Sequence, residues 1–123
     1  MIVHVLIDDT IKSDDRVSMV LFHGTVESDF FNGNILPGGV DTQIVEDDGR
    51  WTLSARYIID GTDRDGTPTR IFVQNDGYME NDRVVTKPRF ITANPKLKFL
   101  ETNSFTGSLE GAPGGVIITI TQD

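Results

Sequence analysis

The residues of this sequence best placed to do chemistry are an aspartate and an arginine on two neighbouring predicted strands. Asp48-Gly49 is a dipeptide typical of a two-residue hairpin turn. Pairing that runs back from such a turn sets Asp41 opposite Arg56. An arginine held by a carboxylate can bind or polarise a substrate oxygen, and the aspartate can move a proton. Asp41 and Arg56 are therefore the predicted catalytic pair.

A second hairpin extends this candidate site. With Asp65-Gly66 as another two-residue turn, Asn75 falls opposite Arg56. Two more polar side chains lie one step away on the same face, and a Gly-Gly pair, able to adopt positive φ, comes just before the aspartate. The predicted substrate-binding residues are therefore Gln43, Ser54, Asn75, Gly38 and Gly39.

A purely structural role for the charge pair is the alternative. An exposed ion pair across two strands stabilises a sheet by at most about 1 kcal/mol and needs no substrate. Close pairing with Arg56 would also lower the pKa of Asp41 and make its carboxylate a weak base. The sequence leaves both interpretations open.

The other face of the first hairpin is apolar. Whether this face points into or out of the fold decides whether the polar site residues lie on the surface or line a cavity. The apolar face carries Trp51, Leu53 and Tyr57. Simple hydrophobicity predicts that this face forms the core. A small barrel with a ligand cavity can be reversed, with polar residues lining the cavity and a partner chain covering the apolar face. Periodicity alone does not decide between these arrangements.

Composition disfavours several classes of function. The 123 residues carry a net charge of −8 with scattered Lys and Arg, which disfavours nucleic acid and anionic membranes as partners. Without cysteine there are no disulfides, thiolate nucleophiles or Cys-based metal sites. The two histidines lie far apart and no phosphate-binding or dinucleotide motif is present, so neither a metal nor a cofactor is expected. Lacking signal-peptide features and any long apolar segment, the sequence predicts a cytoplasmic location.

Short alternating segments separated by turns predict an all-β fold. Strands are expected at 2–7, 16–26, 97–109 and 116–121. Further strands are expected between the second and third of these, in the hairpins with turns at Asp48-Gly49 and Asp65-Gly66. No helix is expected. We predict one domain, residues 1–123, formed by a closed antiparallel meander barrel of about eight to nine strands, because closure removes exposed sheet edges. A sandwich of the same strands is the alternative.

The order of several short motifs resembles a known family. The motifs are Asn32-Gly33, Leu-Pro-Gly-Gly-Val-Asp at 36–41, Asp48-Gly49, Ala-Arg-Tyr at 55–57, Asp65-Gly66, Asn75 with Gly77, and Pro-Arg-Phe-Ile-Thr at 88–92. Over about residues 16–122 this order resembles a bacterial and fungal family known only as a domain of unknown function, DUF3237. That family is similar to small barrels of the allene oxide cyclase and dirigent type. The resemblance therefore implies a closed, calycin-like barrel with an axial cavity.

The chain also departs from the pattern of that family. No aromatic residue follows Asp41, Ile91 replaces a glutamate, and Phe99-Leu100-Glu101 replaces Trp-Leu-Asn. The segment 78–87 is much shorter than usual. If the missing glutamate is catalytic in relatives, this protein lacks the same chemistry. The short segment leaves the mouth of the implied cavity less covered.

Two functions remain open from the sequence. One is a cofactor-independent lyase, isomerase or cyclase for a small, largely apolar carbonyl compound, with Arg56 holding an oxygen and Asp41 moving a proton. The other is a non-catalytic binding or structural module that assembles into a homo-oligomer through its apolar face. A small apolar or carbonyl-bearing ligand is expected as the partner of the cavity, and assembly into a homo-oligomer is expected in both cases.

Overall fold

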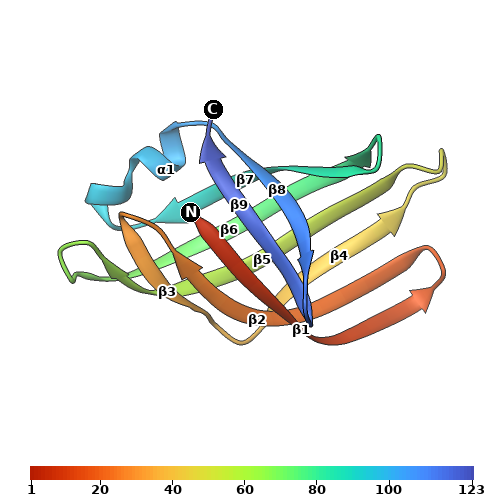
Figure 1. Ribbon diagram of the computed structural model, residues 1–123, viewed down its shortest axis with the longest axis horizontal. Helices are drawn as coiled ribbons and strands as arrows, with labels where there is room; N and C mark the ends of the chain where they lie inside the picture. Colours follow the sequence, from red (N-terminus) through yellow and green to blue (C-terminus); the bar gives the residue numbers. More distant parts are fainter.

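The computed structural model describes residues 1–123 and consists mainly of β-structure (Figure 1). Nine strands form one sheet, with a short helical segment between the last two hairpins. The elements are β1 Ile2–Asp14, β2 Val17–Glu27, β3 Phe31–Ile35, β4 Gly39–Val45, β5 Trp51–Asp63, β6 Pro68–Glu80, β7 Arg83–Thr92, the 3-10 turn η1 Pro95–Leu97, α1 Phe99–Thr102, β8 Phe105–Ala112 and β9 Gly115–Gln122. Neither helical element is long and apolar enough to cross a membrane.

The sheet closes on itself into a barrel. Consecutive strands pair antiparallel, apart from β3 and β4, and β9 pairs with β1 to complete the circle. β3 and β4 share one position between β2 and β5, each pairing with a different part of the two neighbours. The result is a closed meander with one extra strand, which confirms the predicted all-β barrel.

Two glycine turns set the register of the central hairpins. Gly49 has φ 86° and Gly66 has φ 80°, values in the left-handed region that glycine adopts without strain. Each glycine ends a three-residue loop, bounded in the first hairpin by a hydrogen bond from the Glu46 N–H to the Arg50 carbonyl. Three-residue hairpin loops of this kind are common, and they are one residue longer than the two-residue turns predicted from the sequence.

The extra residue in each loop corrects the predicted catalytic pair. Asp41 lies opposite Ala55 rather than Arg56, and Ala55 in turn lies opposite Asn75. Because side chains alternate along a strand, a shift of one residue places Arg56 on the opposite side of the sheet from Asp41. The predicted pair therefore does not form, and Arg56 is exposed on the outside of the barrel.

The apolar face of β5 forms part of the core. Leu53, Tyr57 and Ile59 are buried inside the barrel. Simple hydrophobicity therefore predicts their direction correctly. The alternative in which a partner chain covers this face is wrong, because the barrel itself encloses these side chains.

Bulky side chains fill the barrel beside α1. The buried residues of this packed region include Val3, Phe31, Ile59, Ile71, Phe90, Leu97, Leu100 and Phe105. Outside the cluster, Phe30 packs edge-to-face on Phe99 of α1, with ring centroids 5.1 Å apart. Figure 1 shows α1 in the connection between β7 and β8, near the C-terminus. The helical segment thus acts as a plug for one end of the barrel.

The strand predicted at 97–109 is correct only in its second half. The Asn94 side chain accepts a hydrogen bond from the Lys96 N–H, and Pro95 occupies the first turn of η1. An asparagine cap followed by proline is a typical helix start, because it satisfies a free N–H group and fixes a helical φ. The expectation that the chain has no helix is therefore wrong for η1 and α1.

A buried carboxylate fastens this helical segment to the β5–β6 turn. The Asp63 side chain is only 2% exposed, and Lys96 Nζ lies 2.7 Å from it. Asp63 also accepts hydrogen bonds from the N–H groups of Asp65 and Thr67 and from the Asn94 side chain, each at 2.9 Å. The hydrogen bonds from Lys96 and Asn94 hold the pKa of Asp63 far below its usual range.

We expect Asp63→Asn to lower the thermal midpoint by several degrees at neutral pH, because Lys96 loses its buried charged partner. Since the pKa of Asp63 is lower in the folded state, its stabilisation is complete above the unfolded value of 3.8 and is lost as the pH falls towards the folded value. Circular dichroism melting curves of the two proteins should therefore differ at neutral pH and converge in strong acid. Asp65→Asn, which alters the exposed partner of the same lysine, is the control, and an equal effect of both changes would contradict this account.

Candidate functional site

An apolar cavity of about 330 Å³ lies inside the barrel, in the half nearest the β4–β5 and β6–β7 hairpins. No lining residue comes from η1 or α1. The lining residues are Val5, Ile7, Val20, Phe22, Asp41, Gln43, Trp51, Leu53, Ala55, Tyr57, Asn75, Met79, Val84, Thr86, Leu109, Glu110, Gly111, Val116 and Ile118. Such a size and lining are typical of a small-molecule site.

The register of the strands explains why the cavity exists. Ala55 lies between Asp41 and Asn75 in one row across β4, β5 and β6. In the next row, Gly77 of β6 lies opposite Thr86 of β7. Ala55 leaves space beside the polar residues that a larger side chain would fill, whereas Gly77 allows the backbone of β7 to approach closely.

Four buried polar atoms in this cavity have no hydrogen-bond partner within the protein. They are Asp41 Oδ1, Tyr57 Oη, Asn75 Oδ1 and Thr86 Oγ1. Each unsatisfied buried group costs about 1–3 kcal/mol, and native proteins keep few of them. The residues that carry them all line one cavity, which makes this wall the candidate for contacts with a bound molecule.

The four atoms come from four neighbouring strands, β4, β5, β6 and β7, one from each. The opposite wall, from β1, β2, β8 and β9, supplies mainly aliphatic and aromatic side chains, with only Glu110 charged. The cavity therefore has one polar wall and one apolar wall. A bound molecule would be oriented with its polar groups towards β4–β7.

Asp41 is the ionisable group of the polar wall. Burial raises its pKa, against the opposing effect of hydrogen bonds that include one from Gln43 Nε2 to Asp41 Oδ2 at 2.9 Å. No lysine, arginine or histidine lines the cavity to offset the carboxylate charge. Gln43 holds one oxygen while the other stays free, an arrangement suited to proton transfer.

Tyr57 supplies a hydroxyl to the same polar wall. Its side chain is almost fully buried, and burial raises its pKa, so the hydroxyl stays protonated and can donate a hydrogen bond. Phe22 packs edge-to-face against the Tyr57 ring, with centroids 5.4 Å apart. A Cβ added at Gly39 would lie 3.1 Å from the Phe22 ring, so the glycine makes room for this contact.

The two glycines predicted to bind substrate do not line the cavity. Gly39 is covered by Phe22, and Gly38 lies in an exposed turn with φ 106°. Their role in the structure is to shape the entry into β4. Gln43 and Asn75, by contrast, line the cavity together with Asp41. The sequence predicts these three residues on one face of the sheet.

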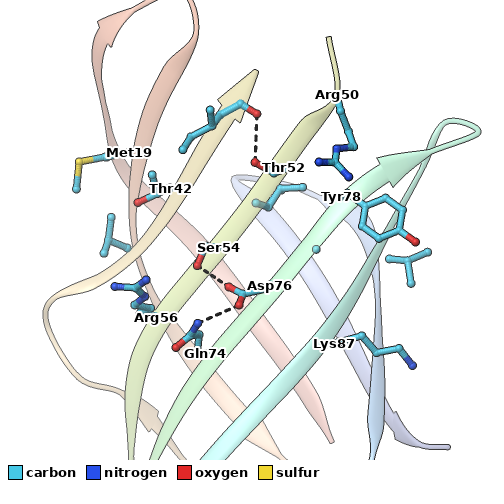
Figure 2. A pocket seen from close by; sticks show the side chains of 15 residues that line it. Met19, Thr42, Arg50, Thr52, Ser54, Arg56, Gln74, Asp76, Tyr78 and Lys87 are labelled. Atoms are coloured by element: carbon cyan, nitrogen blue, oxygen red, sulfur yellow. Dashed lines mark hydrogen bonds between the residues drawn. The ribbon is translucent and has the colours of Figure 1, made fainter. Parts of the chain in front are cut away.

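Ser54 and Arg56 lie instead in a shallow groove on the outer surface of β4–β7, shown in Figure 2. Ser54 donates a hydrogen bond to Asp76 at 2.5 Å, and Gln74 donates one to the other oxygen of Asp76 at 2.9 Å. Arg56 takes part in no ion pair. Neither Ser54 nor Arg56 can contribute to a site with Asp41, because the sheet separates them.

Sequence reasoning missed two residues of the polar wall. Tyr57 was assigned to the core or an interface because it alternates with Arg56, and Thr86 was not considered. Gly107 is the available signal for Thr86, because a Cβ there would collide with Thr86 Oγ1, and strand-interior glycines often mark a close approach. No group of three His, Asp or Glu side chains is placed to hold a metal ion.

Comparison with known proteins confirms the resemblance found in the motifs. A family model described as "Protein of unknown function (DUF3237)" matches residues 3–122. A UPF0311 protein of Clostridium acetobutylicum is 32% identical over 121 residues, covering 84% of this chain and 74% of that protein.

Solved structures share the fold. A protein with unknown function from Clostridium acetobutylicum superposes with a TM-score of 0.79 at 29% identity, covering 98% of this chain and 91% of that one. A beta-barrel like protein from Acinetobacter baumannii gives a TM-score of 0.76 at 22% identity, covering 98% of this chain and 90% of that one. At the latter identity, the similarity concerns the fold alone.

We expect Tyr57→Phe to stabilise the ligand-free protein by about 1–2 kcal/mol, because it removes a buried hydroxyl that has no partner. Urea unfolding of wild type and variant at neutral pH measures this difference. Tyr78→Phe, which removes an exposed hydroxyl on the outer surface, should leave the free energy of unfolding unchanged. Destabilisation by Tyr57→Phe would show that the hydroxyl already has a favourable partner.

Asp41→Asn should raise the thermal midpoint at neutral pH. Because the pKa of Asp41 is higher in the folded state than the unfolded value of 3.8, ionisation costs stability as the pH rises through the folded pKa. Below the unfolded pKa both states carry the neutral acid, so the difference between the two proteins should vanish there. Melting curves as a function of pH test this, with exposed Asp47→Asn as the control; a variant less stable at neutral pH would contradict the prediction.

Proposed function

This chain belongs to the DUF3237 family of proteins of unknown function, and we propose that its barrel binds a small, largely apolar molecule and moves a proton on it. The observation that carries the proposal is the convergence of four unpartnered polar atoms on an apolar cavity. A site that only stabilised the fold would pair these groups with one another or replace them with apolar side chains.

The proposed reaction is a cofactor-independent isomerisation, elimination or cyclisation of a carbonyl compound. Ionised Asp41 removes a proton from the carbon next to the carbonyl, and the electron pair of the broken C–H bond moves onto the carbonyl oxygen. The Tyr57 hydroxyl donates a hydrogen bond to that oxygen as its negative charge develops. The electron pair then returns from the oxygen and re-forms the carbonyl. In an isomerisation another carbon of the same molecule takes the proton from Asp41; in an elimination a C=C bond forms while the bond to the leaving group breaks and that group takes the proton; in a cyclisation the carbon next to the carbonyl bonds to an electrophilic carbonyl carbon of the same molecule, whose oxygen takes the proton.

The remaining polar groups orient the substrate. Asn75 and Thr86 lie on the same wall as Asp41 and Tyr57, while Trp51 and Phe22 are among the aromatic lining residues. Gln43 keeps the Asp41 carboxyl in one orientation through its hydrogen bond. The raised pKa of Asp41 brings the group closer to the neutral range, where a general base is most effective.

A non-catalytic binding module is the second candidate, favoured by the outer groove. Met19 and Tyr78 line that groove and are 42% and 44% exposed. Apolar side chains that gather in one exposed groove are typical of an interaction surface. In this case the cavity holds its ligand passively, and the chain assembles through the groove into a homo-oligomer. A cytoplasmic location, expected from the sequence, fits both candidates.

The proposal is tested by screening small carbonyl compounds for binding with ligand-observed NMR, then following the bound compounds in deuterated water. Ala55→Leu, which fills the space between Asp41 and Asn75, should abolish binding. Arg56→Leu is the matched change on the outer face of the same strand and should leave binding intact. Wild type should exchange carbon-bound protons for deuterium, and Asp41→Asn should slow this exchange by about a hundredfold or more.

The outcomes separate the candidates. Binding without exchange supports the passive module, whereas exchange that survives in Asp41→Asn assigns the proton transfer to another group. Loss of activity in Arg56→Leu would contradict the placement of the site inside the barrel.

A further inference from the structure

We infer that the natural ligand of the cavity is neutral and carries a hydroxyl group beside its apolar body. This inference rests on the proposed function and deepens it. The hydroxyl anchors the molecule through Asn75 and Thr86, and the carbonyl of the proposed reaction is a separate group placed at Tyr57 and Asp41.

The hydrogen-bonding capacity of the four unpartnered atoms carries the inference. Asn75 Oδ1 is an amide oxygen and Asp41 Oδ1 a carboxylate oxygen, so both can only accept when Asp41 is ionised. Tyr57 and Thr86 are hydroxyls, and each has a hydrogen to donate. A ligand that satisfies the wall must therefore both donate and accept hydrogen bonds.

Among simple uncharged groups, a hydroxyl does both. A ketone only accepts and would leave the Asn75 and Asp41 oxygens without a donor. An ammonium group only donates and would leave the hydrogens of Tyr57 and Thr86 without an acceptor. Each group left unpaired in the complex loses binding free energy, so the wall discriminates against both.

The charge of the cavity excludes anionic ligands. The lining contains two carboxyl groups, Asp41 on the polar wall and exposed Glu110, and no basic side chain. A carboxylate or phosphate would enter an apolar space without a cation to pair with, and would be repelled by Asp41. The overall charge of −8 adds to that repulsion at a distance.

The size of the cavity sets the scale of the apolar body. Its volume of about 330 Å³ is roughly twice that of a cavity known to hold benzene, about 150 Å³. A compact two-ring or cage hydrocarbon with one small substituent matches this volume. The adamantyl skeleton is therefore a suitable probe.

The experiment compares four adamantyl compounds that differ in one substituent: the methanol, the methyl ketone, the methylamine and the carboxylate. Trp51 is the only tryptophan of the chain and lines the cavity, so its fluorescence reports on binding, and adamantyl compounds do not absorb in the same range. We expect the alcohol to bind most tightly, the ketone and the amine at least about tenfold more weakly, and the carboxylate not at all.

Variants show whether the polar wall is responsible. Asn75→Leu, which removes an acceptor at similar volume, should reduce the affinity ratio of alcohol to ketone roughly fivefold or more. Tyr78→Phe on the outer surface should leave this ratio unchanged. Ala55→Leu should abolish the fluorescence change for every probe.

Equal affinities of alcohol and ketone, or tightest binding of the amine, would overturn the hydroxyl inference and leave the proposed binding function standing. An unchanged ratio in Asn75→Leu would overturn it as well. If none of the four compounds changes Trp51 fluorescence at its solubility limit, both the inference and the proposed function fail.

Discussion

The length of two glycine-ended loops determines which side chains face the interior of this barrel. Gly49 and Gly66 each end a three-residue loop, and the loops fix how β4, β5 and β6 pair. In a two-residue loop the same strands would shift by one position, and Asp41 would share a face with Arg56. Because the sheet is closed, such a shift would have to be absorbed around the whole barrel. One residue in the length of each loop thus decides whether Asp41 stands without Arg56 or shares a face with it.

One half of the barrel is densely packed and stabilises the fold, and the other half contains the cavity. Large side chains and the plug of α1 fill one half, where Asp63 fixes the helical segment through Lys96 and Asn94. The other half contains Ala55 at an interior position beside polar groups that lack partners. Cavities and unsatisfied polar atoms both reduce stability, so the packed half must compensate for the open one. This distribution is what a binding protein requires and what a purely structural barrel would avoid.

Much of the fold could be predicted from the sequence, and much less of the site. Alternating strands, glycine turns and the ordered motifs together indicate a closed antiparallel barrel, because each signal depends only on local residue types. The orientation of β4 relative to β5 depends on loop length, and Asp-Gly occurs in loops of two and of three residues. Because of this ambiguity of one residue, the sequence predicts Arg56 on the same face as Asp41. It predicts Tyr57 on the opposite face, among the apolar residues. Gln43 and Asn75 were placed with Asp41 correctly, although through a pairing that does not form.

The arrangement of the polar atoms also bears on how well the site can discriminate. Asp41, Tyr57, Asn75 and Thr86 stand on four adjacent strands whose spacing is fixed by continuous backbone hydrogen bonds. Groups on a sheet keep their separation far better than groups on loops, so a ligand must match their pattern rather than induce it. The facing wall is apolar and offers shape but few directional contacts. In the proposed binding function, specificity therefore depends on one rigid wall, and affinity depends on the apolar surface that the opposite wall buries.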